Sequence, residues 1–191
     1  MKLLLAVALI AAPANAPYPR YSYFTPNPLI KLVVCEGPIG TYSGTAFVVG
    51  PNVLLTANHV IARDNCNIDG EPVNIVSTAP DLDFAVLTTA RAYAHWFPID
   101  CGGFRPGEYI YAHGHGQGRP GNMVVVARAT GFGEQIFDGV RPFARISGND
   151  FIHGQSGGPV FTGRGVTGMV NAVDEGHASF SRELKDTVAC R

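Results

Sequence analysis

Short apolar runs separated by turn residues dominate the chain. Residues 53–57 (VLLTA) and 84–88 (FAVLT) each have the length and the mostly apolar character of a buried strand, and residues 109–112 (YIYA) give a further strand signal. Convincing helical periodicity is scarce, and its clearest example is residues 181–188, close to the C-terminus. The pattern therefore predicts an all-β protein with one short C-terminal helix.

Composition agrees with many short strands. The chain has 191 residues, of which 46% are apolar, so it can bury the core of one or two small domains. Gly 23 and Pro 14 are high counts, whereas charged residues make up only 15%. The net charge is −1 and no run of Lys or Arg occurs, which argues against a nucleic-acid partner.

The N-terminus has the pattern of a secretory signal peptide. Lys2 supplies a positive end, residues 3–12 an apolar core, and residues 14–16 (ANA) a cleavage site of the small-x-small type. The apolar run is shorter than the roughly 20 residues that span a bilayer. We expect cleavage after Ala16, leaving 175 residues that are secreted or periplasmic without stable membrane association. The alternative is an uncleaved membrane anchor.

Three segments carry residues that can together activate a serine as a nucleophile. Ser156 lies in the glycine-rich stretch GQSGGP, His59 follows an apolar run in TANHV, and Asp83 directly precedes another apolar run. A serine attacks well when a histidine takes its proton and an aspartate fixes the tautomer of that histidine. Asp81 competes with Asp83 for the last role, but the apolar run begins directly after Asp83, which favours its burial beside a histidine.

The letters Gly-x-Ser-x-Gly also occur in the nucleophile elbow of α/β-hydrolases. That fold places the serine before its aspartate and histidine in the chain, whereas the order here is His59, Asp83, Ser156. The chain after Ser156 is also too short for the remaining strands and helices of a hydrolase sheet. The elbow interpretation is therefore rejected.

The three motifs resemble those of the chymotrypsin/trypsin clan of serine proteases, and more closely its short bacterial and viral members. TANHV (residues 56–60) is similar to the histidine motif of the clan, DFAVL (83–87) to its aspartate motif and GQSGGPV (154–160) to its serine motif. The likeness extends over about residues 29–184, most of the mature chain.

The resemblance implies two six-stranded antiparallel Greek-key barrels packed together. The expected order is a signal peptide (1–16), an extended N-terminal arm (17–28), a first barrel with the histidine and the aspartate (29–98), and a second barrel with the serine and the C-terminal helix (99–191). No extra domain or coiled coil is evident, so we expect a monomer.

The activity implied by the resemblance is hydrolysis of peptide bonds in a protein or peptide substrate. Ser156 is expected to attack, His59 to act as base, Asp83 to orient His59, and the N–H groups of Gly154 and Ser156 to hold the oxyanion. Neither a cofactor nor a metal is required. Digestive members hold an Asp directly before the serine as part of a zymogen switch, whereas this chain has Gln155 there. We therefore expect activity once the signal peptide is removed.

Two features give conflicting indications of substrate preference. Asp150 lies six residues before the serine, where trypsin-like members carry an acidic residue that selects Arg or Lys. Asn171, Ala172 and Val173 stand where those enzymes have Ser-Trp-Gly, and Val173 in place of glycine would narrow the pocket and favour small or medium apolar side chains. Both preferences stay open.

Four cysteines in an exported chain indicate two disulfides, and the residues themselves leave all three pairings open. The resemblance favours two of the possible bonds, because the first two cysteines fall on strands that are adjacent in the first barrel of the clan. The implied pairs are Cys35–Cys66 and Cys101–Cys190.

Histidines outside the three motifs give weaker indications. His113 and His115 alternate along the chain and could share one face of a strand, yet two histidines without further ligands make a poor zinc site, and a glycine-rich loop after the strand is the plainer interpretation. His153, three residues before the serine, either borders the substrate pocket or lies in a solvent-facing loop.

Two other classes of function are kept beside the protease. One is a catalytically silent member of the same clan that acts as a binding module. The other is a structural or metal-binding β protein in which the motifs are accidental.

Overall fold

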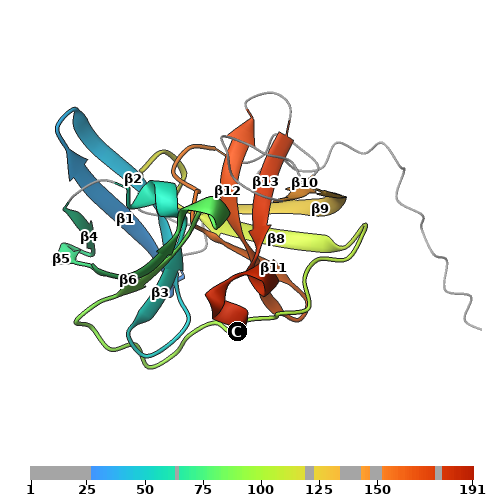
Figure 1. Cartoon of the computed structure of the whole chain (residues 1–191), viewed down its shortest axis with the longest axis horizontal. Helices are drawn as coiled ribbons and strands as arrows, with labels where there is room; N and C mark the ends of the chain where they lie inside the picture. Colours follow the sequence, from blue (N-terminus) through green and yellow to red (C-terminus); the bar gives the residue numbers. More distant parts are fainter. Residues whose placement is uncertain (1–26, 63–64, 119–122, 134–142, 147–151, 175–177) are drawn as a thin grey trace, which may run out of the picture.

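The computed structural model describes residues 27–62, 65–118, 123–133, 143–146, 152–174 and 178–191. They form an all-β structure, without an α-helix among them, in which two sheets lie side by side (Figure 1). The blue and green strands make the first sheet and the yellow to red strands the second. The expected signal peptide lies outside the described residues, and so does most of the expected N-terminal arm.

The first sheet curls but stays open among the described residues, and it has seven strands in the order β5-β4-β1-β2-β3-β7-β6. The six-stranded barrel expected here is therefore not what the structure shows. The two edges are the short β5 and the exposed β6. The strands are β1 (Ile30–Gly37), β2 (Gly40–Val48), β3 (Val53–Thr56), β4 (Cys66–Ile68), β5 (Glu71–Pro72), β6 (Asn74–Ala79) and β7 (Phe84–Thr88).

The second sheet closes into a barrel of six strands in the order β10-β13-β12-β11-β8-β9. The strand pairings described for this barrel are antiparallel, with bulges in β11 and β12. The strands are β8 (Tyr109–Gly114), β9 (Met123–Gly133), β10 (Phe143–Ile146), β11 (Pro159–Thr162), β12 (Gly165–Asp174) and β13 (Ala178–Glu183).

The helix expected over residues 181–188 is wrong. Strand β13 continues to Glu183 because its last residues pair with β12, so that Ser181 lies opposite Val170. Two short 3-10 helices follow, η4 (Leu184–Asp186) and η5 (Val188–Cys190). The pairing with a neighbouring strand overrides the weak helical period of this segment.

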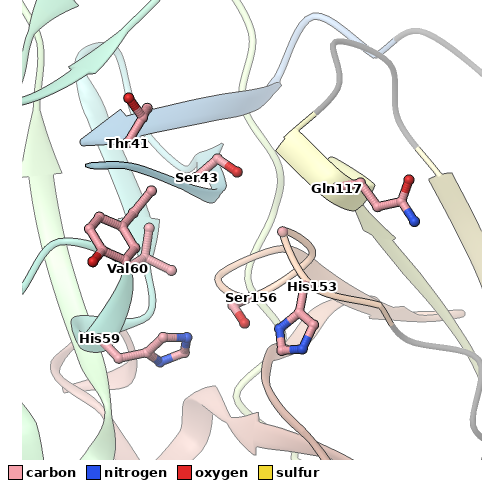
Figure 2. Close-up of a pocket in the computed structure, with 9 residues that line it drawn as sticks. Thr41, Ser43, His59, Val60, Gln117, His153 and Ser156 are labelled. Carbon is pink, nitrogen blue, oxygen red and sulfur yellow. The ribbon is translucent and has the colours of Figure 1, made fainter. Parts of the chain in front are cut away.

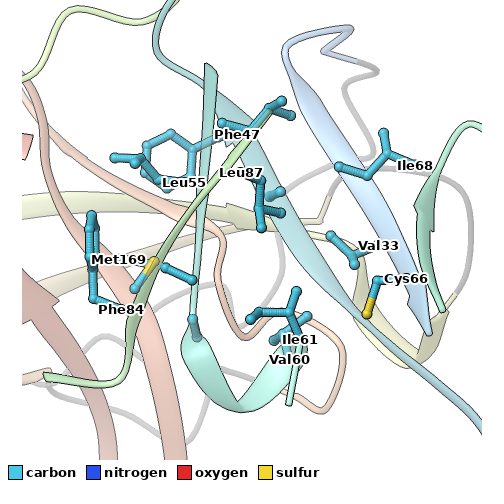
Figure 3. Close-up of a cluster of buried hydrophobic side chains, with 14 of the residues drawn as sticks. Val33, Phe47, Leu55, Val60, Ile61, Cys66, Ile68, Phe84, Leu87 and Met169 are labelled. Atoms are coloured by element: carbon cyan, nitrogen blue, oxygen red, sulfur yellow. The ribbon is translucent and has the colours of Figure 1, made fainter. Parts of the chain in front are cut away.

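One hydrophobic core reaches from the first sheet into the second. Phe47, Leu55 and Phe84 of the first sheet are almost fully buried and belong to the same cluster as Met169 of β12 and Leu184 of η4. Figure 3 shows Met169 beside Phe84. Burial of apolar side chains from both sheets stabilises the packing of one sheet against the other. This packing fixes which residues of the two sheets face each other.

The connection between the sheets, residues 89–108, is itself tied to the second barrel. Ile99 forms a parallel bridge with Val166 of β12, and Asp100 N–H donates to the Val166 carbonyl at 2.9 Å. Backbone pairing of this kind gives a long irregular segment a defined path.

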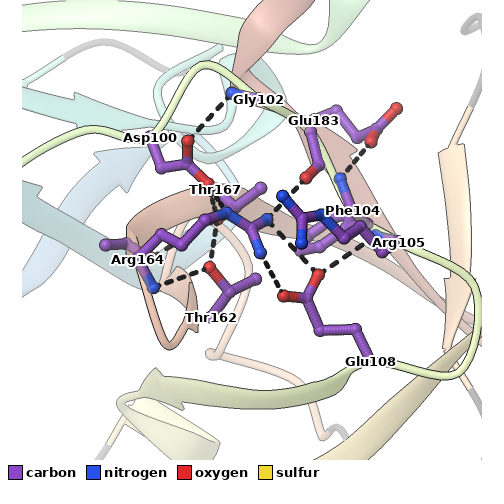
Figure 4. Close-up of polar contacts among 11 residues, drawn as sticks. Asp100, Gly102, Phe104, Arg105, Glu108, Thr162, Arg164, Thr167 and Glu183 are labelled. Atoms are coloured by element: carbon purple, nitrogen blue, oxygen red, sulfur yellow. Dashed lines mark hydrogen bonds and ion pairs between the residues drawn. The ribbon is translucent and has the colours of Figure 1, made fainter.

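Arg164, in the turn between β11 and β12, holds the same connection by its guanidinium (Figure 4). It donates to Asp100 Oδ2 at 2.7 Å and to the Gly103 carbonyl at 2.9 Å, and it pairs with Glu108. Partial burial acts to raise the pKa of Asp100, but hydrogen bonds from Gly102 N–H and Arg164 outweigh it and hold that pKa below its usual value. The connection is thereby fixed to the barrel that carries the serine.

Both expected disulfides are confirmed. Cys35 of β1 lies directly opposite Cys66 of β4 and is bonded to it. Cys101 of the connection is bonded to Cys190 in the last 3-10 helix, which fastens the C-terminus to the start of the second barrel.

We expect the Cys101–Cys190 bond to be a major source of stability. It joins residues 89 positions apart, so it restricts the unfolded chain strongly. Replacing both cysteines with Ser should lower the free energy of unfolding by about 2–4 kcal/mol. Urea unfolding of the oxidised parent and the double variant measures this, and a variant as stable as the parent would contradict it.

Candidate active site

His59 lies three residues after the buried strand β3. Strand β3 pairs with β2 on one side and β7 on the other, and η1 (Asn58–Val60) begins two residues after it. The Thr56 hydroxyl donates to the Thr45 carbonyl at 2.7 Å, which ties the end of β3 to β2. A histidine placed at such an end has a rigid backbone beneath it, while its own side chain is 49% exposed.

Asp83 lies between η2 (Pro80–Leu82) and β7 in a left-handed conformation, with φ 47° and ψ 51°. Aspartate tolerates this region better than most residues. Its side chain is 10% exposed, and its carboxylate accepts three hydrogen bonds. These come from the His59 backbone N–H at 2.8 Å, His59 Nδ1 at 2.7 Å and Asn171 Nδ2 at 2.7 Å.

This arrangement selects one tautomer of the histidine. An ionised carboxylate only accepts hydrogen bonds, so the proton of His59 resides on Nδ1, where it faces Asp83. The lone pair then resides on Nε2. A histidine oriented in this way can take a proton from a neighbouring hydroxyl.

Asn171 of β12 has a position that the sequence analysis did not foresee. It was expected in the wall of the substrate pocket, but its buried amide donates to Asp83 twice, to Oδ2 at 2.7 Å and to the backbone carbonyl at 3.1 Å. No signal in the sequence distinguishes an asparagine that crosses to another sheet from one that faces a pocket. Asn171 therefore links the strand after the serine to the aspartate.

The two residues that follow Ser156 in its turn must be glycines. Gly157 has φ +81°, and a Cβ on it would lie 2.1 Å from the Thr45 carbonyl oxygen. A Cβ on Gly158 would lie 2.0 Å from the His113 carbonyl oxygen. The two glycines therefore let the serine turn lie directly against β2 and β8.

Ser156 and His59 line the same pocket, a cavity of about 550 Å³ (Figure 2). Tyr42 of β2 and His153 also line it, so the pocket lies between the first sheet and the serine turn. In this view Ser156 is drawn between the rings of His59 and His153. The Ser156 hydroxyl donates to the Asn171 carbonyl at 3.4 Å, which is a weak hydrogen bond. His153 thus borders the pocket, as one of its two interpretations expected.

The buried side chain of Gln155 stabilises the loop that precedes Ser156. Its side chain is fully buried, and its Oε1 accepts a hydrogen bond from Ile152 N–H at 2.8 Å. The Gln155 backbone N–H also donates to the Ile152 carbonyl, at 3.2 Å. These bonds close a tight turn immediately before Gly154 and Ser156, and both partners belong to the turn itself.

The remaining expected pocket residues are seen only in part. Asp150 lies outside the described residues. Ala172 and Val173 are on β12, in register with β13, but the structure describes only their backbone. The two expected substrate preferences therefore stay predictions.

The expected loop at His113 is wrong, because β8 extends to Gly114 and includes this histidine. His113 packs edge-on against Phe161 with ring centroids 5.2 Å apart, and its buried Nδ1 has no partner among the described residues. Within those residues no group of three His, Cys, Asp or Glu side chains is placed to hold a metal ion.

We expect His113 to make the fold sensitive to acid. Burial lowers the pKa of its imidazole below the ordinary 6.5, so the unfolded chain takes up this proton first as the pH falls. The contribution of neutral His113 to the free energy of unfolding is fully present above about pH 6.5. It is lost as the pH falls toward the lower pKa that His113 has in the folded protein. Urea unfolding from pH 8 to 5 should show a smaller loss in His113→Leu than in the parent. The exposed His95→Leu variant is the control and should keep the pH dependence of the parent.

Comparisons with known proteins find likenesses between this chain and peptidases. A family model described as a trypsin-like peptidase domain matches residues 44–169. A search of curated protein sequences finds no match. No helix among the described residues is long and apolar enough to cross a membrane.

Several solved protease structures share the fold. The active form of the Rv3671c protease from M. tuberculosis has a TM-score of 0.68 at 20% identity, over 91% of this chain and 89% of that chain. The HtrA-type protease AlgW with a tripeptide has 0.69 at 21%, over 83% and 57%. The MamO protease domain from Magnetospirillum magneticum has 0.66 at 17%, over 85% and 95%. At these identities the likeness concerns the fold alone.

Proposed function

The chain belongs to the trypsin-like peptidase family, and on this basis we propose that it is a serine endopeptidase acting through Ser156, His59 and Asp83. The observation that carries the proposal is the 2.7 Å contact between His59 Nδ1 and Asp83 Oδ2 at a pocket that Ser156 also lines. Three segments far apart in the sequence contribute residues to this region, and this supports the proposal because an oriented histidine can activate a nearby serine.

In the proposed first half-reaction, Ser156 Oγ attacks the carbonyl carbon of the substrate peptide bond. In this mechanism the hydroxyl leaves its weak hydrogen bond to the Asn171 carbonyl and donates to His59 Nε2 instead. His59 takes the proton as the bond forms, and Asp83 stabilises the resulting imidazolium. His59 then protonates the leaving amine, and the acyl group stays on Ser156.

In the second half-reaction, water repeats these steps on the acyl-enzyme. His59 takes a proton from the water, the hydroxide adds to the ester carbonyl, and Ser156 leaves with that proton. In both halves a negative oxygen develops, and the backbone N–H groups of Gly154 and Ser156 are the proposed donors to it. The proposed mechanism uses no cofactor.

We also propose that no zymogen switch operates. Gln155 closes the turn before Ser156 through hydrogen bonds with Ile152, a residue of the same turn. On this proposal the turn needs no contact with a freed N-terminus. The N-terminal pattern supports export with cleavage after Ala16, and the working form is then a monomer of residues 17–191 that acts on protein or peptide substrates.

A fluorophosphonate probe tests this proposal, because it labels only an activated serine. The purified 17–191 protein should be labelled without further trimming, and the Ser156→Ala and His59→Ala variants should not. A folded parent that resists the probe would contradict the proposal and favour a catalytically silent binding protein. Labelling that begins only after N-terminal trimming would contradict the absence of a zymogen switch.

A further inference from the structure

Gly154 lies between two peptide groups whose carbonyls are both held by hydrogen bonds. The carbonyl before it, of His153, accepts from Gln117 N–H at 2.6 Å. Its own carbonyl accepts from the Thr45 hydroxyl at 2.8 Å. The two donors come from different parts of the molecule, since Thr45 is on β2 of the first sheet and Gln117 is in η3 (Gly116–Gly118), which follows β8 of the second.

The bond to the His153 carbonyl determines where the Gly154 N–H can point, and the bond to the Gly154 carbonyl holds the next peptide group. No peptide bond in the described chain is cis, so the N–H of Gly154 is directed opposite to the His153 carbonyl that Gln117 holds. Gly154 and Ser156 both line the pocket that His59 and His153 border (Figure 2). Among the described residues, no acceptor inside the protein takes the N–H of Gly154 or of Ser156. Both donors stay available at the pocket.

Thr45 connects all the parts of this arrangement. The residue is fully buried, and its hydroxyl also accepts from His115 N–H at 2.9 Å, two residues before Gln117. Its backbone N–H donates to the Ser156 carbonyl at 2.8 Å. One threonine therefore touches the serine turn at two points and His115, the residue before η3, at a third.

Gln117 contributes its backbone in a conformation that depends on the side chain. It has φ 56° and ψ 29°, the left-handed region, where glycine and asparagine are tolerated and β-branched residues are strongly disfavoured. A change of residue type at this exposed position can therefore move the backbone N–H without removing a buried side chain.

We propose that Thr45 and the backbone of Gln117 form a positioning clamp that keeps the Gly154 N–H aimed at the oxyanion. Both act through Gly154, so they are positioning residues. The inference rests on the proposed peptidase function and goes further, because it assigns the orientation of one oxyanion donor to two residues outside the three motifs.

The first test is Thr45→Val with Thr45→Ser as its matched control. Valine keeps the shape of threonine but lacks the hydroxyl, so the Gly154 carbonyl loses its donor. We expect kcat to fall by about 10- to 100-fold with KM changed less than threefold, since loss of a whole oxyanion donor costs about 10²–10³-fold. The serine variant keeps the hydroxyl and should retain most of the parent kcat.

The second test keeps the proposal falsifiable should Thr45→Val fold poorly. Gln117→Ile disfavours the left-handed backbone and should lower kcat, whereas Gln117→Gly permits that backbone and should retain kcat. Both variants lack the Gln117 amide, so a difference between them does not come from the loss of that amide.

A transition-state analogue separates positioning from a general loss of structure. A peptide trifluoromethyl ketone, built on the sequence that the parent cleaves best, forms an oxyanion on Ser156. Its affinity should fall by the same factor as kcat/KM in Thr45→Val and Gln117→Ile, while the affinity for the cleaved product peptide stays within threefold.

Unchanged kcat in folded Thr45→Val and Gln117→Ile, beside an active parent, would overturn the clamp and leave the peptidase proposal intact. Equal losses of ketone and product-peptide affinity would also overturn it. A parent that hydrolyses no peptide would overturn both proposals.

Discussion

Replacing Ser156 with Ala is expected to lower kcat for peptide hydrolysis by about 10⁶-fold, and His59→Ala by a similar factor. The serine supplies the attacking oxygen and the histidine takes its proton, so neither step proceeds without the other residue. For the same reason the double variant should be no slower than either single variant, because groups that act as a unit have strongly non-additive effects. Single-turnover kinetics on one peptide substrate measures all three.

The matched control for this prediction is His95→Ala. His95 is an exposed histidine with no role in the proposed mechanism, so its removal should leave kcat within about twofold of the parent. A Ser156→Ala variant that retains more than a hundredth of the parent kcat would contradict the assignment of the nucleophile.

Asp83→Asn is expected to lower kcat at neutral pH by about 10⁴-fold, the effect of losing the correct tautomer. The amide of asparagine can donate to Nδ1 of His59, and the proton of the ring then resides on Nε2. A histidine in that form cannot accept the serine proton. Steady-state kinetics at pH 7 to 8 measures the loss, and KM should change little because Asp83 does not touch the substrate.

Asp81→Asn is the matched control for Asp83. Asp81 is exposed in η2, two residues away, and it was the competing candidate in the sequence. We expect the Asp81 variant to keep the parent kcat. Equal losses in the two variants, or a larger loss for Asp81, would contradict the assignment of Asp83.

The sequence predicted the strands beside the candidate site because their signals are local. The strand ending at His59 and the strand beginning after Asp83 are visible as apolar runs, and β3 and β7 occupy nearly the predicted residues. The glycines after Ser156 are equally visible, and contacts with Thr45 and His113 explain why no Cβ fits there.

The missed features depend on contacts between distant residues. Pairing of β13 with β12 replaced the expected C-terminal helix, and the first sheet has seven strands where a six-stranded barrel was expected. The amide of Asn171 reaches Asp83 from a residue 88 positions away, and Thr45 reaches Gly154 over 109 positions. A single sequence contains no local pattern for such partners.

A cleavage map tests the central claim most directly. The 17–191 protein and its Ser156→Ala variant would be incubated with a diverse peptide library, and the products identified by mass spectrometry. The account predicts internal cuts made only by the parent. The residue before each cut would show whether Asp150 selects basic side chains or Val173 selects smaller apolar ones. Equal cutting by the two proteins, or no cutting by a well-folded parent, would contradict the proposed serine endopeptidase.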